Sequence, residues 1–293
     1  MMLFWLLMVG VVAQFVDATL GMAFGLTSTT MLTLLGTTPA AASASVHTAE
    51  IGTTLISGLA HWRAGNVDRR VLVRLAVPGA LGALFGALML STFSLTAARP
   101  FIASILLVLG LILVARFGLR PPSGINKATS REPSTSFLAP LGLVAGFIDA
   151  SGGGGWGPIA TPTLLTLASA SPRRVIGTVS AAEFLVSLAA VLGFVSGSAY
   201  AGVDLRIVAA LLLGGALIAP FAARLVRRLD PQRFGLLVGL LVVLFNGDAL
   251  LRLASAPGLL RLGFLFGVGV LGVYVRLRSA RLLIEPTATD SRM

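Results

Sequence analysis

Cysteine is absent from this sequence, and charged residues are scarce. Without cysteine the chain has no disulfide, no thiolate metal ligand and no cysteine nucleophile. Charged residues make up 11% of its 293 positions, whereas soluble domains carry about 25%. Apolar residues make up 56%, and the mean hydropathy is +0.95. These values exclude a water-soluble globular domain and predict an all-α integral membrane protein.

Acidic residues are half as numerous as basic ones, 11 against 22, so the formal net charge is +11. A basic balance can indicate nucleic-acid binding, but such binding needs a basic face on a folded surface. Here the basic residues form short clusters between long apolar runs, as they do in loops between membrane helices. The sequence also has no metal-ligand cluster, nucleotide-binding loop or pair of nucleophile and base. We therefore expect no nucleic-acid partner, no catalytic residue or enzyme activity, no metal and no cofactor.

Apolar runs supply the candidate membrane spans. Crossing a bilayer takes about 20 helical residues, and seven runs are long enough: 38–60, 71–91, 98–117, 175–196, 205–223, 234–251 and 258–277. Two further runs, 3–36 and 137–168, are each interrupted by an aspartate and glycines. Each interruption leaves two arms of about 11 to 15 residues. We expect neither arm to cross the membrane on its own.

The two interrupted runs belong to an internal duplication on either side of a polar linker. A shift of 132 residues aligns Asp17 with Asp149, and a shift of 133 aligns Glu50 with Glu183. The sequence therefore predicts a first membrane repeat at 1–117, a cytoplasmic linker at 118–136, a second repeat at 137–252, and an extra transmembrane helix with a cytoplasmic tail at 253–293.

The positions of lysine and arginine indicate how the repeats lie in the membrane, because these residues collect in cytoplasmic loops. If both interrupted runs cross once, the 22 basic residues divide 11 to 11 between the two sides. If each run is a hairpin that dips in and returns, 18 lie inside and 4 outside. Each repeat then has one re-entrant hairpin and three crossings, so the repeats are inverted relative to each other. We predict a multi-pass protein of a bacterial-type inner membrane, with its N-terminus outside and its C-terminus in the cytoplasm.

The broken tips of the two hairpins are the predicted substrate site. Gly152, Gly153, Gly154 and Gly155 allow a sharp turn with bare N–H groups, and the next arm begins with a helix N-terminus, which attracts anions. The matching arm of the first repeat carries the hydroxyls of Thr27, Ser28, Thr29 and Thr30, and Thr161 stands at the place of Thr29. The glycines can instead serve only to pack helices closely. Matching breaks in both halves favour a binding site near the midplane.

Asp17 and Asp149 directly precede the two breaks. A charged group at the bilayer centre costs on the order of 3 kcal/mol or more, so each carboxylate needs a partner, a proton or water. We expect each to accept hydrogen bonds from N–H groups at its own hairpin tip, as an N-cap residue does. A carboxylate fixed beside an anion would otherwise repel it.

Glu50 and Glu183 are matched residues deep within the spans that follow the hairpins. Burial disfavours the charged form of a carboxylate, so each glutamate is predicted either to carry protons or to tie helix ends together. His47 lies three residues before Glu50, on much the same helix face, and Ser180 takes its place in the second repeat. Both are further candidates for contact with the substrate.

These motifs resemble the TauE/SafE family of sulfite-exporter-like membrane proteins. Residues 145–150 read AGFIDA and are followed by the glycine run and Thr161-Pro162, while residues 14–18, QFVDA, are a weaker copy. The resemblance covers nearly the whole chain. It implies a transporter that moves a small sulfur oxyanion or an organosulfonate out of the cytoplasm.

The leading hypothesis is therefore an exporter of sulfite or an organosulfonate that works by alternating access. Its expected partners are this small anion and the lipid bilayer, and the oligomeric state stays open. A rival hypothesis is proton-coupled transport of a cation or a neutral metabolite, with Glu50, Glu183 and His47 as carriers. A third is a membrane scaffold or sensor, which gives no role to the paired breaks.

Overall fold

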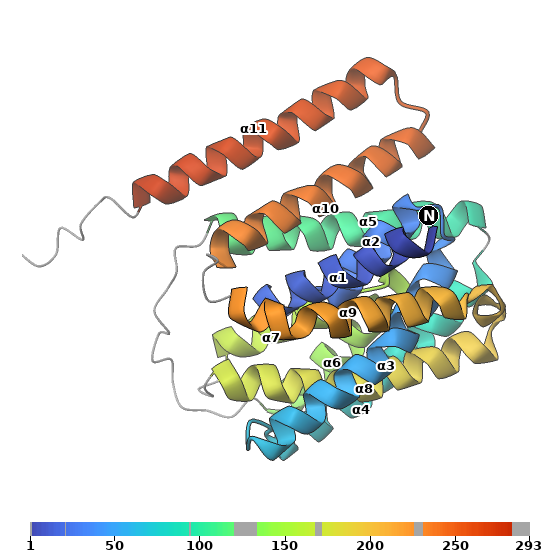
Figure 1. The fold of residues 1–293 in the computed structure, drawn as a ribbon, viewed down its shortest axis with the longest axis vertical. Helices are drawn as coiled ribbons and strands as arrows, with labels where there is room; N and C mark the ends of the chain where they lie inside the picture. The colour runs from blue at the N-terminus through green and yellow to red at the C-terminus, as the bar shows by residue number, and fades with distance from the viewer. Residues whose placement is uncertain are drawn as a thin grey trace, which may run out of the picture.

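The fold is a bundle of helices (Figure 1). The computed structural model describes residues 2–20, 22–93, 95–119, 134–167, 172–225 and 231–282. All regular elements in these ranges are helical, and the main ones are α1 (Met2–Leu20), α2 (Phe24–Leu34), α3 (Pro39–Arg63), α4 (Arg69–Thr92), α5 (Leu95–Val114), α6 (Thr135–Gly152), α7 (Trp156–Leu167), α8 (Pro172–Ser196), α9 (Leu205–Leu225), α10 (Pro231–Leu253) and α11 (Gly258–Leu282). A π-helical turn, η1 (Ala115–Leu119), and a 3-10 turn, η2 (Ser198–Gly202), complete the order. Residues 120–133 of the predicted linker lie outside the described residues.

Five helical stretches are long and apolar enough to cross a membrane, which confirms the all-α membrane class. They are Arg69–Thr92, Ala97–Gly118, Thr135–Gly152, Arg174–Ser196 and Gly235–Leu253. Shorter apolar stretches occur in α1, α9 and α11. The predicted span 38–60 forms most of α3, a helix of 25 residues that buries polar side chains such as Ser43, His47 and Glu50.

The first arm of each broken segment is longer than the sequence predicts. Helix α1 has 19 residues and α6 has 18, about 28 and 27 Å at 1.5 Å per residue. The expectation that neither arm can cross is therefore wrong for α6, which is one of the five span-length helices. The helices continue through Asp17 and Asp149, and the breaks come only after Leu20 and Gly152. The second arms, α2 and α7, have 11 and 12 residues.

The same order of helices occurs twice, and repeated residues mark the same boundaries. Pro39 and Pro172 are the first residues of α3 and α8, where a proline needs no hydrogen-bond partner for its nitrogen. Asp68 Oδ1 accepts hydrogen bonds from two backbone N–H groups at the start of α4, at 3.0 and 3.2 Å. Asp204 Oδ1 accepts one at 2.8 Å at the start of α9. These aspartates act as N-caps in corresponding places.

Corresponding helices of the two halves run in opposite directions where they pack together. On α3 and α8, Glu50 contacts Ser187 while Gly58, two turns further along α3, faces Ala181. Residue numbers therefore rise along one helix as they fall along the other. The same opposite course is found for α5 and α10.

Close contacts through glycine hold helices of one half against helices of the other. Helix α4 packs along α6, with Gly146 against the carbonyl oxygen of Gly79. Helix α1 packs along α9, where a Cβ atom on Gly10 would lie 2.7 Å from the carbonyl oxygen of Leu211. Small residues of this kind let helix backbones approach closely in membranes. The two broken segments are thereby held in the middle of the bundle.

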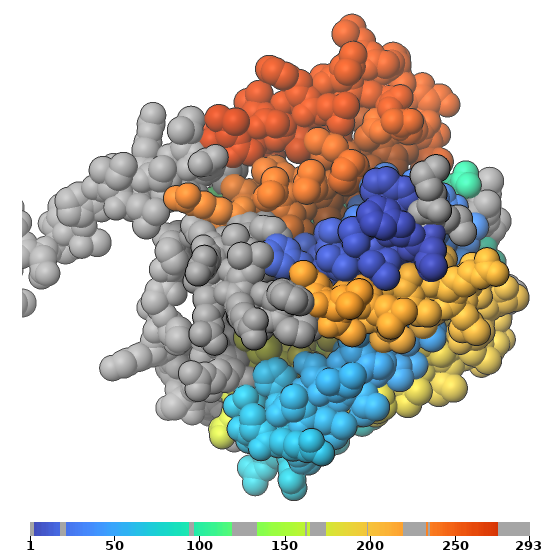
Figure 2. All heavy atoms as spheres, viewed as in Figure 1, coloured from blue at the N-terminus to red at the C-terminus, as the bar shows by residue number. Residues whose placement is uncertain are grey.

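Helix α11 lies at the edge of the bundle, outside the two repeated sets of helices (Figures 1 and 2). It packs on α10, and Phe264 contacts Gly247 there. Several of its apolar side chains are exposed, including Leu259 and Phe266. Lipid is the natural surrounding for such a surface, since hydrocarbon tails are as apolar as these side chains.

Candidate functional site

The two chain breaks are in direct contact with each other. The Thr29 hydroxyl of α2 donates a hydrogen bond to the carbonyl oxygen of Gly153, between α6 and α7. A Cβ atom on Gly25 would lie 2.9 Å from both Gly154 Cα and Glu50 Oε1. The beginning of α2, the glycine run and the carboxylate of Glu50 therefore meet at one point.

The glycine run forms the turn between α6 and α7. Gly153 has φ +75° and Gly154 has φ +149°. Residues with a Cβ atom rarely adopt these backbone conformations. The N–H groups of both residues donate to the carbonyl oxygen of Asp149, at 2.7 and 3.0 Å. The N–H of Gly155 donates to Asp149 Oδ1 at 2.7 Å. These groups have internal partners in the described conformation, so anion binding by Gly152–Gly155 stays a prediction.

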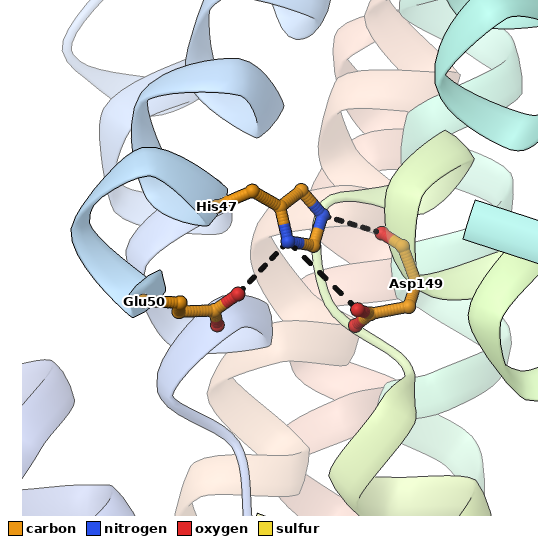
Figure 3. A group of neighbouring side chains, drawn as sticks. All are labelled: His47, Glu50 and Asp149. Atoms are coloured by element: carbon orange, nitrogen blue, oxygen red, sulfur yellow. Dashed lines mark hydrogen bonds and ion pairs between the residues drawn. The ribbon is translucent and has the colours of Figure 1, made fainter. Parts of the chain in front are cut away.

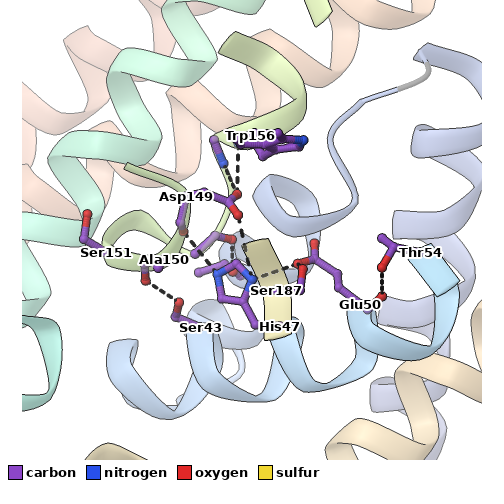
Figure 4. Close-up of polar contacts among 12 residues, drawn as sticks. Ser43, His47, Glu50, Thr54, Asp149, Ala150, Ser151, Trp156 and Ser187 are labelled. Carbon is purple, nitrogen blue, oxygen red and sulfur yellow. Dashed lines mark hydrogen bonds and ion pairs between the residues drawn. The ribbon is translucent and has the colours of Figure 1, made fainter. Parts of the chain in front are cut away.

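Asp149 sits on the N-terminus of α7 as an N-cap residue does (Figure 4). Its Oδ1 accepts hydrogen bonds from the N–H groups of Gly155 and Trp156, the latter at 2.9 Å. Its Oδ2 is buried and has no hydrogen-bond partner among the described residues. In the first repeat, Asp17 forms a hydrogen bond with the backbone of Phe24, the first residue of α2. At each break, an aspartate from the preceding helix therefore binds the first turn of the helix that follows.

His47, Glu50 and Asp149 form a buried triad at the same point (Figure 3). His47 Nδ1 lies 2.9 Å from Glu50 Oε2 and 3.8 Å from Asp149 Oδ2. On the other side of the ring, His47 Nε2 lies 3.3 Å from the carbonyl oxygen of Asp149. Only 0 to 2% of each of these three residues is exposed.

The contacts of His47 indicate which of its ring nitrogens carries a hydrogen. A carbonyl oxygen can only accept, so His47 Nε2 carries the hydrogen that faces Asp149. His47 Nδ1 and Glu50 Oε2, 2.9 Å apart, would repel each other through their lone pairs if both lacked a proton. A proton on either group would relieve this repulsion, although Nδ1 forms no hydrogen bond of regular geometry with a described residue. A shared proton in a buried pair is what a proton carrier requires.

The triad also has the composition of a small cation site. One nitrogen and two carboxylate oxygens of these residues lie within 4.8 Å of one another. The described ion pairs of Glu50 and Asp149 are made with His47 alone. Two buried carboxylates and one imidazole need a proton or a cation to balance their charge, because an uncompensated buried charge costs several kcal/mol. These three residues come from two distant parts of the chain, so the sequence, which predicts no metal, does not show them as a set.

The second repeat contributes less to the triad. Glu183 is half-buried on α8 and lies within electrostatic reach of Glu50, Asp149 and Asp17. Ser180, the counterpart of His47, is half-buried on the same helix. Within the described ranges, neither forms a hydrogen bond or ion pair with the triad. Their roles stay predictions.

Buried hydroxyls without partners lie on both arms that begin at the tips. The side-chain oxygens of Thr27 and Ser28 on α2, and of Thr161 on α7, have no hydrogen-bond partner in the described part of the chain. Their exposed fractions are 7, 0 and 1%. An unpaired buried hydroxyl costs about 1–3 kcal/mol, so such groups at a functional site point to water or a ligand. By contrast, Thr30 Oγ1 accepts a hydrogen bond from Asn246 at 3.3 Å.

Two contacting residues had no role in the sequence interpretation. Ser187 donates to Glu50 Oε2 at 3.3 Å, and Asn246 binds Thr30 from α10. The shift of 133 places Ser187 at the position of Thr54, one turn after the repeated glutamate. That match was a usable signal for Ser187, whereas the sequence offers none for Asn246.

The chain is similar to known membrane transporters. A sequence model of the family described as "Sulfite exporter TauE/SafE" matches residues 6–248. The "Probable membrane transporter protein YtnM" of Bacillus subtilis (strain 168) is 43% identical over 247 residues, which are 83% of this chain and 81% of that protein. No solved structure matches the chain significantly.

Proposed function

This chain belongs to the sulfite exporter TauE/SafE family of membrane transporters, and on that basis we propose that it exports a small anion, sulfite or an organosulfonate. This membership confirms the family assignment made from residues 145–150 and the glycine run that follows them. In this proposal the protein lies in a bacterial-type inner membrane with its N-terminus outside, and it acts as a transporter rather than an enzyme.

The observation that carries the proposal is the set of unpaired hydroxyls beside the touching tips. Thr27, Ser28 and Thr161 offer neutral donors on two helices whose N-termini meet. Neutral donors can replace part of the hydration shell of an oxyanion without holding it so tightly that it cannot leave. We therefore assign the anion to the space between α2 and α7, with Thr29 and Gly153 as the contact that separates to admit it.

The proposed transport cycle uses the two halves as inverted repeats. The opposite course of α3 and α8, and of α5 and α10, supports a two-fold axis in the membrane plane. The segments α1–α2 and α6–α7 would then enter from opposite faces. Rocking of residues 1–117 against 137–252 would expose the tips to each side in turn.

Protons take part in the proposed cycle because carboxylates surround the site. An anion near Glu50 and Asp149 is repelled unless the triad holds enough protons, so anion binding should accompany proton uptake. The membrane potential already favours export, by about 2.3 kcal/mol per charge at 100 mV. The triad also favours a second candidate, proton-coupled transport of a cation, since its three ligand atoms lie within 4.8 Å of one another.

Flux in proteoliposomes tests the proposal. Purified protein should pass sulfite or an organosulfonate down its gradient, and liposomes without protein should not. Cation uptake driven by a pH gradient is measured in the same preparation. Cation uptake without flux of any oxyanion would reject anion export and favour the second candidate.

A further inference from the structure

Away from the triad, the ends of four helices form a partly open cavity of about 250 Å³ whose walls are mostly apolar. Its walls come from the C-terminal part of α2, the beginning of α3, the beginning of α5 and the end of α10. Its polar lining includes Thr30, Thr37, Arg99, Asn246 and Arg252. None of the described residues that line it is acidic.

Two arginines line this cavity, and a third is bridged to one of them. Arg99 and Arg252 line it, and Arg261 is joined to Arg252 through Asp248, whose two carboxylate oxygens lie 2.7 and 2.8 Å from the guanidinium Nε atoms. Asp248 balances only one of these charges. Arg99 is exposed and has no ion-pair partner in the part of the chain that the structure describes.

The arginines also contrast with the rest of the surface on their side of the membrane. Only 4 of the 22 basic residues are predicted outside, namely Arg99, Arg206, Arg252 and Arg261. Two of these four line one cavity, and Arg261 is bridged to one of them through Asp248. Basic residues are disfavoured outside, so their concentration at a single opening points to a ligand of negative charge.

The floor of the cavity lies next to the tips. Asn246 Nδ2 donates to Thr30 Oγ1 at 3.3 Å and to the Val242 carbonyl oxygen at 2.9 Å. Both Asn246 and Thr30 are buried, with 4 and 3% exposed. Thr30 follows Thr29, whose hydroxyl holds Gly153. The hydrogen bond from Asn246 to Thr30 therefore lies one residue along α2 from the contact between the two breaks.

We propose that this cavity is the outer vestibule through which the transported small oxyanion leaves. Arg99 supplies the unpaired positive charge at its mouth, and Asn246 with Thr30 closes its floor. The inference rests on the proposed function and adds the path and the residues that select for negative charge. Arg99 is a binding residue of the vestibule, separate from the triad.

Charge-selective labelling of an introduced cysteine tests the vestibule. The native chain has no cysteine, so Thr37→Cys is labelled alone, with an anionic and a cationic methanethiosulfonate reagent of similar size. A cationic opening should raise the anionic-to-cationic rate ratio about tenfold above that of Thr92→Cys. Thr92 is an exposed control at the end of α4. Arg99→Gln should remove most of this preference, while Arg99→Lys should keep it.

Equal rate ratios at the two cysteines, or a preference that survives Arg99→Gln, would overturn the vestibule. Labelling needs no transport, so this failure is distinct from failure of the proposed function. If the charge preference is found in protein that passes no oxyanion, the cavity is positively charged but is not an exit path for an oxyanion. If flux is present but the preference is absent, the anion leaves by another path.

Discussion

Asp149→Ala should abolish most transport, lowering the initial rate of anion flux on the order of a hundredfold. The alanine leaves two N–H groups of α7 without an acceptor, and loss of an N-cap costs about 0.5–2 kcal/mol. It also removes the carboxylate beside His47. A hundredfold lower rate corresponds to about 2.7 kcal/mol in the barrier to transport, which the loss of the cap and of the charge at the site would together have to supply. Initial rates in proteoliposomes at matched protein content measure the effect.

The variant Asp149→Asn distinguishes the N-cap role of Asp149 from the role of its negative charge. An asparagine oxygen can still accept from Gly155 and Trp156, so this variant should fold and keep the turn but lose the charge. We expect its flux to be reduced, because the negative charge beside His47 is lost. Asp204→Asn is the matched control, since it changes an N-cap at α9 away from the triad. Flux at the normal rate in Asp149→Ala would contradict a role for this residue in transport.

Glu50→Gln should remove the response of transport to a pH gradient while leaving exchange of anion for anion. Glutamine can bind Ser187 and His47 but cannot share a proton with His47 Nδ1. A gradient of one pH unit supplies about 1.4 kcal/mol per proton, enough to change the anion distribution up to about tenfold. That change should occur in the native protein and be absent in the variant. The anion distribution across proteoliposomes at fixed membrane potential is the measurement.

Glu183→Gln is the control for this experiment, because Glu183 occupies the corresponding place but does not contact His47 among the described interactions. It should retain the pH response. A pH response that survives Glu50→Gln, or disappears only in Glu183→Gln, would place the transported proton outside the triad.

Local features of the fold follow from the sequence where one residue acts on its own helix. Pro39 and Pro172 begin α3 and α8 because proline suits the first helical position. The lengths of the first arms were predicted less well than the breaks, which come shortly after the two aspartates and beside the glycines, as expected. An aspartate in the last turn of a helix does not end it, so α1 and α6 run on to Leu20 and Gly152.

The site was harder to predict because it joins distant residues. His47 and Asp149 are 102 positions apart, and the duplication suggests symmetric sites, whereas the triad takes its imidazole from the first half alone. The contact of Asp149 with its own turn is local and could be expected from sequence, and Oδ1 does accept from Gly155 and Trp156. The approach of His47 and Glu50 to the same carboxylate could not, since it depends on how the two halves pack.

The central claim is that α1–α2 and α6–α7 enter the membrane from opposite faces and return. Single cysteines at Leu3, Leu35, Ala64, Ser136 and Arg174, labelled by an impermeant maleimide in cells and in inverted vesicles, test it directly. All five positions are exposed in the structure. We predict labelling from outside at Leu3 and Leu35, and from the cytoplasm at Ala64, Ser136 and Arg174. Labelling of Leu3 and Leu35 from opposite faces, or of Ser136 and Arg174 from opposite faces, would contradict the inverted hairpins and the anion site between them.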